Sequence, residues 1–186
     1  MIYTTSHVRI PESAVINLKN ASHKISARVT IPTGGAHGVI ACQGGNMSGW
    51  SLYLDEEGKP SYHYNCYGQY LTTITGKVPL IRGTHEILLN YQHDGGFGNG
   101  GLATLYINSE PTDQARIDRT VPIIFSMSGE TFDVGIDTGA PVGPYPHEYP
   151  FTGDIHEVVL ERIGRRDPET KRKMKNGMKQ AGLRSQ

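Results

Sequence analysis

The stretch Lys24-Ile25-Ser26-Ala27-Arg28-Val29-Thr30-Ile31 determines the fold class of this chain. Apolar residues occupy every second position and polar residues fill the gaps, which is the pattern of a β-strand with one buried face and one solvated face. Pro32-Thr33-Gly34-Gly35 follows directly, and residues of these types favour turns. We therefore expect a strand over residues 24–31 that ends at Pro32.

Further short segments of the same kind follow along the chain. Strands are expected at Val39–Cys42, Trp50–Leu54, Pro60–Tyr67, His85–Tyr91, Leu102–Asn108, Thr131–Asp137 and Ile155–Leu160. Asp55-Glu56-Glu57-Gly58 lies between two of them and predicts a hairpin turn, with Gly58 supplying a positive φ. About ten closely spaced strands with no helical pattern between them predict an all-β fold, an antiparallel two-sheet sandwich or a barrel.

The composition agrees with this prediction and excludes several classes of protein. The 186 residues include 23 glycines, 11 prolines and 10 tyrosines, and their formal net charge is zero. A neutral chain has no overall field to attract nucleic acid or an anionic membrane. No run of eighteen apolar residues predicts a membrane span, and residues 1–5 lack the pattern of a signal peptide. We expect a cytoplasmic protein if Met1 is the native start.

The charge distribution indicates a boundary near residue 162. Residues 1–162 carry a net charge of −6 and are expected to form the sandwich domain, whereas residues 163–186 carry +6. In this basic tail, Asp167 and Pro168 are suited to the start of a helix of about three turns that ends by Gly182. We expect a solvated tail, which is also the one segment suited to contact nucleic acid.

The two cysteines are expected to be free thiols. Cys42 and Cys66 belong to predicted strands that flank a third strand, the one over residues 50–54. Two inter-strand spacings would separate their backbones by about 9–10 Å, which is beyond the reach of a disulfide. We therefore expect two half-buried thiols and no disulfide.

Several blocks of the sequence, in order, resemble the C-terminal concanavalin A-like domain of large bacterial arylsulfatases. The blocks are Val8–Glu12, Lys19–His23, Gly38–Gly45, Gly49–Leu54, Tyr91–Gly101, Thr131–Gly139 and Phe151–Gly153. The resemblance covers residues 8–160 and implies a jelly-roll sandwich of the lectin/glucanase type. Unlike those large enzymes, this sequence contains no catalytic portion, and its basic tail is not a feature of the family.

The same resemblance raises the question of catalysis. Sulfatases form their formylglycine within a Cys/Ser-x-Pro-x-Arg motif, and the sequences after Cys42 and Cys66 do not match it. A jelly-roll glycosidase needs two facing carboxylates. Asp133 and Asp137 are expected on one face of one strand, but the Glu-x-Asp-x-x-Glu pattern of laminarinase-like enzymes is absent. We therefore expect a non-enzyme, with a jelly-roll glycosidase or lyase as a minor alternative.

Candidate binding residues come from aromatic and acidic positions. The candidates for ligand binding are Trp50, Tyr64, Tyr67, Asp133 and Asp137. An exposed Trp50 indole would stack on a sugar ring, whereas burial is the commoner fate of tryptophan. In the loop over residues 94–101, Asp94 and Asn99 are candidate ligands for a single calcium ion, although a hairpin connection explains the glycines without any ligand.

Two functions from different classes follow from these observations. The first is a noncatalytic, lectin-like carbohydrate-binding module. Because the domains it resembles occur in sulfatases, its glycan would be sulfated. The acidic sandwich argues against a polyanionic ligand. The second is a structural module that docks on a sulfatase-type catalytic chain or associates with itself through exposed sheet edges.

Overall fold

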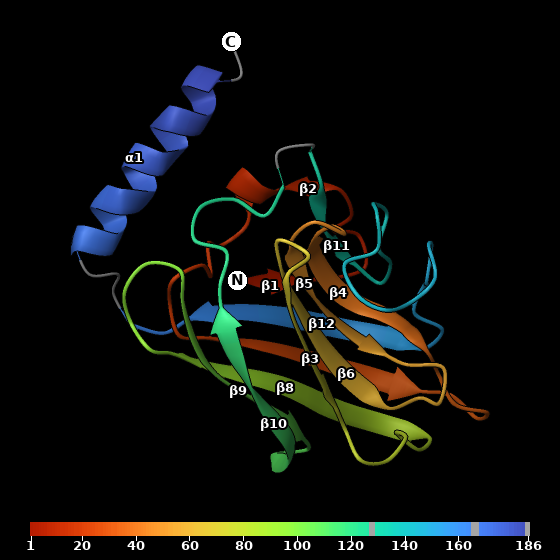
Figure 1. The fold of residues 1–186 in the computed structure, drawn as a ribbon. Helices are drawn as coiled ribbons and strands as arrows, with labels where there is room; N and C mark the ends of the chain where they lie inside the picture. The colour runs from red at the N-terminus through yellow and green to blue at the C-terminus, as the bar shows by residue number, and fades with distance from the viewer. Residues whose placement is uncertain (127–128, 165–167, 185–186) are drawn as a thin grey trace.

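Two antiparallel sheets of six strands lie face to face in the computed structural model, which describes residues 1–126, 129–164 and 168–184 (Figure 1). Sheet A contains, in spatial order, β1 (Ile2–Tyr3), β12 (Asp154–Arg162), β3 (His23–Ile31), β8 (Gly83–His93), β9 (Asn99–Ile107) and β10 (Glu110–Arg119). Sheet B contains β2 (Ile10–Pro11), β11 (Thr131–Val134), β4 (Gly38–Gly44), β5 (Gly49–Leu54), β6 (Pro60–Cys66) and β7 (Tyr70–Thr75). The all-β antiparallel sandwich is confirmed.

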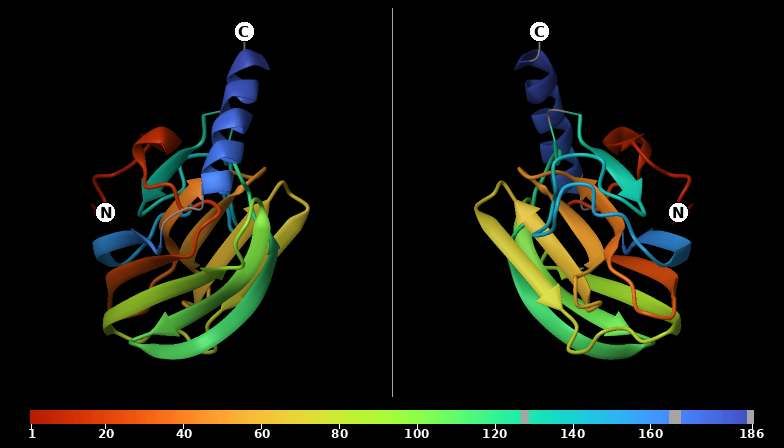
Figure 2. Two further views of the ribbon diagram at one scale, coloured as in Figure 1. Left: turned by 90° about the vertical axis from the view of Figure 1, so that its left-hand side faces the viewer. Right: turned by 90° about the vertical axis from the view of Figure 1, so that its right-hand side faces the viewer.

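Helical structure is minor in the described residues. A short 3-10 helix, η1 (Glu12–Ala14), follows β2, and α1 (Pro168–Arg184) is longer than the three turns expected. Asp167, the expected cap, lies outside the described residues. Figure 2 shows α1 projecting from one end of the sandwich. A Cβ built on Gly177 would lie 2.4 Å from Ile123 Cδ1, so the helix backbone closely approaches the segment after β10.

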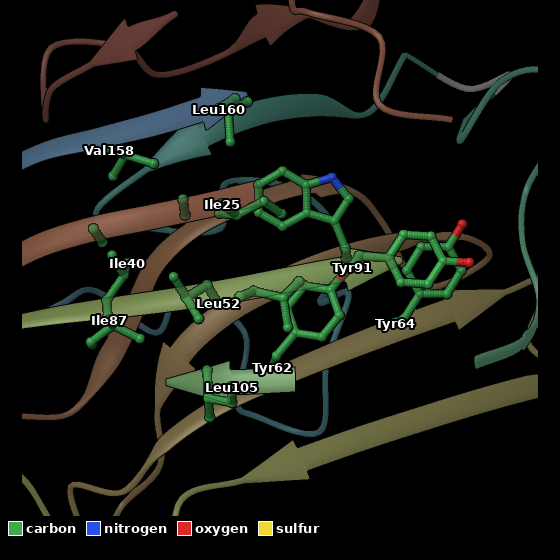
Figure 3. Close-up of a cluster of buried hydrophobic side chains, with 14 of the residues drawn as sticks. Ile25, Ile40, Leu52, Tyr62, Tyr64, Ile87, Tyr91, Leu105, Val158 and Leu160 are labelled. Atoms are coloured by element: carbon green, nitrogen blue, oxygen red, sulfur yellow. The ribbon is translucent and has the colours of Figure 1, made fainter. Parts of the chain in front are cut away.

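The core fills the space between the two sheets. In β3, the residues from His23 to Ile31 alternate between buried and more accessible positions, as the sequence pattern predicts. Figure 3 shows side chains from both sheets meeting in this layer, among them Ile25 and Ile87 from sheet A and Leu52 from sheet B. Burying such side chains stabilises the fold by about 1.5–3 kcal/mol each.

The central strands of sheet B are buried on both faces. Every residue of β4, β5 and β6 is buried, whereas an antiparallel strand exposed on one side would alternate. For β4 and β5, a second, smaller hydrophobic cluster explains the difference, because it packs Val142 and Tyr149 from the segment 136–151 against Val39, Cys42 and Tyr53. This segment, which we call the covering loop, lies on the outer face of sheet B.

Several strand predictions hold and others need correction. The hairpin of β5 and β6 turns at Asp55–Gly58, with Gly58 at φ 78°, as expected. Cys42 and Cys66 lie on strands separated by β5 and are free thiols, although they are fully buried and not half-buried. The expected strand over residues 131–137 is too long, because β11 ends at Val134 and Gly135 has φ 84°. The sequence pattern did not predict the strands β7 and β10, or the two-residue strands β1 and β2.

Candidate functional site

The covering loop is held at its C-terminal end by contacts with the segment that enters β4. The Val39 amide donates to Tyr149 O at 2.9 Å, and the Thr152 amide donates to His37 O at 2.9 Å. Gly38 makes this close approach possible, since a Cβ at that position would lie 2.1 Å from Pro150 O. Gly38 also has φ 112°, a conformation that other residues rarely adopt.

Asp137 fixes the inner part of the covering loop. Its carboxylate accepts hydrogen bonds from the Val142 amide at 3.0 Å, the Tyr145 hydroxyl at 2.8 Å and the Gly139 amide at 3.3 Å. Burial raises the pKa of Asp137, while these donors act in the opposite direction. Tyr145 is therefore positioned through its hydroxyl group by a buried carboxylate.

Asp133 holds the start of the loop and the N-terminal segment. It accepts hydrogen bonds from the Arg9 amide, from the Thr131 hydroxyl at 3.2 Å, and from both the amide (3.2 Å) and the hydroxyl (2.8 Å) of Thr138. The structure thus brings Asp133 and Asp137 together as predicted, but on a strand and the loop after it rather than on one strand.

Cys42 completes a buried cluster with these two carboxylates. One ligand-type atom from each of Cys42, Asp133 and Asp137 lies within 4.8 Å of the others. Burial, followed by the charges of Asp137 and Asp133, raises the pKa of the Cys42 thiol, and the thiol donates to Ile136 O at 3.7 Å. A metal ion would need the thiolate and free carboxylate oxygens. The protein donors occupy this cluster as a structural anchor, and it does not fit a metal site.

A groove of about 250 Å³ opens beside this anchor, between the covering loop and the β5–β6 turn. It is lined by Tyr53, Asp55, Glu56, Glu57, Pro144, Tyr145, Pro146 and Tyr149, and we call it the tyrosine groove. The rings of Tyr145 and Tyr149 are stacked, with centroids 5.7 Å apart and planes at 14°. Tyr53 meets Tyr145 edge-on at 5.0 Å. Three aromatic rings therefore form a fixed wall.

Carboxylates from the hairpin turn form the opposite side of the tyrosine groove. Asp55 Oδ1 accepts hydrogen bonds from the amides of Glu57 (3.0 Å) and Lys59 (2.8 Å), which fixes the turn. Lys59 Nζ lies 2.5 Å from Glu57 and lowers the pKa of that carboxyl group. Glu56 is exposed and has no hydrogen-bond or ion-pair partner among the described residues. The groove is accordingly acidic.

The hydroxyl group of Tyr149 has no hydrogen-bond partner in the described part of the chain, although it is buried. Burial raises the pKa of Tyr149, and the charges of Glu56 and Asp55 raise it further. Burial also raises the pKa of Tyr53 to about 12. Both hydroxyl groups are therefore protonated at neutral pH, and that of Tyr149 keeps an unused donor near the two carboxylates.

Trp50 and Tyr64 do not lie at any surface site. Trp50 is 1% exposed, packs against Phe132 at 6.1 Å, and its Nε1–H donates to Gln43 Oε1 at 3.2 Å. Tyr64 is buried in the core (Figure 3), and its hydroxyl group accepts a hydrogen bond from the Val121 amide at 3.0 Å. Both rings pack between the sheets, so neither offers a face for stacking on a surface sugar.

Tyr67 is exposed, but it lies away from the tyrosine groove. It is 47% exposed in the turn between β6 and β7, where it adopts a left-handed backbone conformation with φ 59°. Tyr70, Leu71 and Met47 are also exposed, and Leu71 pairs with Asn65, whose side chain bonds to Asn46 O. We call these four exposed side chains, on β7 and in the turns near it, the β7 patch; Tyr70 and Leu71 are neighbours on the strand and therefore point to opposite faces of it.

The residues proposed for calcium already have protein partners. Asp94 Oδ2 pairs with the guanidinium group of Arg116, and Asn99 Nδ2 donates to Gly95 O at 2.9 Å. The Asp94 amide bonds to Gly100 O, and Gly95, Gly96 and Gly98 have positive φ, which is the expected hairpin connection. A cation beside the Asp94 carboxylate disfavours calcium there, and no group of three close metal-ligating side chains in the described residues includes it.

The sequence did not identify the aromatic wall of the groove. The segment 141–150 is rich in proline, and Asp55–Gly58 is predicted as a turn, but nothing in either pattern shows that they meet. The spacing of Tyr145 and Tyr149 between prolines was the one available signal.

Comparisons with known proteins agree with the fold. No family model and no curated protein matches the chain. The carbohydrate-binding module CBM40 of the Ruminococcus gnavus IT-sialidase is similar in structure, with 18% identity, a TM-score of 0.53 and coverage of 83% of each chain. The same module was also solved bound to α2,3-sialyllactose, with 17% identity and a TM-score of 0.53 over 84% of this chain and 83% of that one. Domains LG4-5 of the mouse laminin α1 chain give 10% identity and a TM-score of 0.55, over 87% of this chain and 42% of that one.

At these identities the likeness establishes a jelly-roll sandwich and nothing about residues or ligands. The resemblance to arylsulfatase C-terminal domains stays a prediction. No α-helix in the described part of the chain has the length and apolar character that crossing a membrane requires.

Proposed function

We propose that this protein is a noncatalytic carbohydrate-binding module whose ligand lies in the tyrosine groove. The observation that carries the proposal is the groove itself, where stacked Tyr145 and Tyr149 face the acidic β5–β6 turn. A pocket that combines aromatic walls with a few placed polar groups is the usual form of a small-molecule site.

The chemistry of a sugar matches this arrangement. The C–H face of a pyranose packs on an aromatic ring, and the hydroxyl groups of the sugar donate hydrogen bonds to carboxylates. Pro144 and Pro146 stiffen the loop, which lowers the entropy lost when a ligand binds. Asp133 and Asp137, the carboxylates considered for glycosidase chemistry, are buried and engaged by protein donors, which favours binding without catalysis.

The similar module from Ruminococcus gnavus adds support for the class of ligand. It was solved with sialyllactose, which is a glycan, bound to the same type of sandwich. The residues around that ligand are not carried over to this chain.

Binding of purified protein to a glycan panel, measured by calorimetry, tests the proposal with two matched variants. Tyr149→Phe removes a buried, unpartnered hydroxyl group in the groove, and Tyr91→Phe removes a buried, unpartnered hydroxyl group between the sheets. Each should change the free energy of unfolding by less than about 1 kcal/mol, because no protein hydrogen bond is lost.

The glycan that binds should lose about five- to tenfold in affinity with Tyr149→Phe and nothing with Tyr91→Phe, since one hydrogen bond contributes about 1 kcal/mol. Equal affinities for the two variants, or no binding across the panel, would exclude the groove as the site.

The β7 patch supports a second candidate function, an assembly module. β7 is an edge strand of sheet B, and Leu71 on it is 59% exposed. An exposed apolar edge favours docking on another chain, such as a sulfatase-type catalytic chain, or self-association. Sedimentation of the protein and of Leu71→Lys separates these cases, since a self-associating protein should become monomeric with the added charge. If the wild-type protein sediments as a monomer, self-association is excluded, and the assembly function would then require docking on another chain.

A further inference from the structure

The charge around the tyrosine groove is strongly asymmetric. Of its eight lining residues, Asp55, Glu56 and Glu57 are acidic, and none is basic or a histidine. The nearest cation along the turn, Lys59, is already paired with Glu57 at 2.5 Å. A ligand in the groove therefore meets the carboxylate of Glu56, which pairs with no cationic side chain among the described residues. It also meets that of Asp55, whose Oδ1 accepts two backbone amides and whose charge acts on Lys59 without forming an ion pair.

The unused hydroxyl group of Tyr149 is an independent indication of a ligand. The residue is 7% exposed, its hydroxyl group has no partner in the described residues, and it lines the same groove as the two carboxylates. Buried polar groups in folded proteins are nearly always satisfied, so an unsatisfied one at a groove indicates a missing partner. Because Tyr149 lines the groove together with Asp55 and Glu56, a ligand that supplied this partner would also meet these carboxylates.

We infer that the tyrosine groove selects sugars that carry a protonated amine and discriminates against sialylated or sulfated sugars. An ammonium group donates to Asp55 and Glu56, and a neighbouring sugar hydroxyl accepts from or donates to Tyr149. An anionic sugar in the same position faces two like charges, and no lysine, arginine or histidine is among the residues that line the groove. The His37 ring packs on Tyr149, with centroids 5.4 Å apart, but it does not line the groove. This inference rests on the proposed function and departs from the sulfated ligand that the sequence suggested.

The test compares three probes by calorimetry at about pH 6, where a sugar amine is protonated. The probes are a β-1,4-linked glucosamine trisaccharide, its fully N-acetylated form, and 3′-sialyllactose. The glucosamine trisaccharide should bind at least about tenfold more tightly than the N-acetylated form, and sialyllactose should bind most weakly. The preference should shrink as NaCl rises from about 50 to about 500 mM, because salt screens exposed charges.

Two charge variants test whether the preference for the glucosamine probe arises in the tyrosine groove. Glu56→Gln removes the unpaired carboxylate and should reduce the preference for the glucosamine probe several-fold, while binding of the N-acetylated probe stays within about twofold. Glu110→Gln, an exposed carboxylate in β10 on the other sheet, should leave every affinity unchanged.

The two proposals fail in different ways. If the N-acetylated or sialylated probe binds as tightly as the glucosamine probe and loses affinity with Tyr149→Phe, the groove binds sugars but the charge selectivity is refuted. If a probe binds and Tyr149→Phe has no effect on it, the site itself is elsewhere and both proposals fall.

Discussion

His23 and His63 are buried as neutral rings on opposite sheets. Burial lowers the pKa of each from 6.5 to about 4, although His23 Nδ1 lies 2.9 Å from Ala21 O and His63 Nδ1 lies 2.8 Å from Thr73 Oγ1. In the unfolded chain both rings take up a proton near pH 6.5, whereas in the fold they do so only near pH 4. Protonation therefore favours unfolding between these values.

We predict that stability is fully present above about pH 6.5 and falls as the pH drops toward 4, with a loss of at least about 1 kcal/mol by pH 4.5. Urea denaturation at pH 7, 5.5 and 4.5 measures this loss. A His63→Gln variant should show a shallower pH dependence, and a variant at the exposed His147 should match the wild type. A flat profile for the wild type would contradict the prediction.

Single residues also show how far the sequence could predict the site. Trp50, Leu52 and Leu54 occupy alternate positions of β5 and therefore lie on the same face of the strand. The two leucines already indicate that this face points into the core. Tyr53 lies on the opposite face of β5, which we would expect to contact solvent. It is buried because the covering loop packs over it. Alternation along a strand identifies the inner face, but it does not show which outer faces another segment will cover.

At the scale of elements, the covering loop is the structure on which the site depends. It follows β11, which Gly135 ends three residues earlier than the alternating pattern predicts. The covering loop is attached to sheet B by backbone pairing between residues about 100 positions apart in the sequence, such as Val39 with Pro150. Strand positions follow from local patterns, whereas these contacts depend on the tertiary fold, which explains why the strands were predictable and the groove was not.

Replacing Asp137 with asparagine should loosen this loop. Val142 and Tyr145 both donate to Oδ2, whereas the Gly139 amide donates to Oδ1. An asparagine amide group replaces one of these two acceptors with an N–H donor and removes the charge, so one set of bonds is lost and the other becomes a weaker, neutral set. We expect Asp137→Asn to lower the free energy of unfolding by about 1–3 kcal/mol and to weaken glycan binding, because the hydrogen bonds that hold Gly139, Val142 and Tyr145 are lost or lose their charged acceptor.

Urea denaturation and calorimetry measure both effects of Asp137→Asn. Asp154→Asn, at an exposed carboxylate that begins β12, provides the control and should leave both quantities unchanged. If Asp137→Asn keeps wild-type stability and affinity, the buried carboxylate does not position the groove.

At the scale of the whole molecule, an acidic sandwich presents one acidic groove, and a basic helical tail stands outside it (Figures 1 and 2). We propose that residues 1–162 form the binding unit and that the tail from residue 163 is separate from it. The boundary follows from the change in charge and composition along the chain. The place of the groove follows from how the covering loop packs on sheet B.

The most direct test of the central claim is a ¹H–¹⁵N NMR titration of the full chain with the panel glycan that binds most tightly. The account predicts that the largest chemical-shift changes fall on the amides of residues 53–59 and 145–149, the two segments that line the groove. Changes concentrated on the β7 patch, or on the Asp94–Asn99 loop, would contradict it and place the ligand elsewhere on the sandwich.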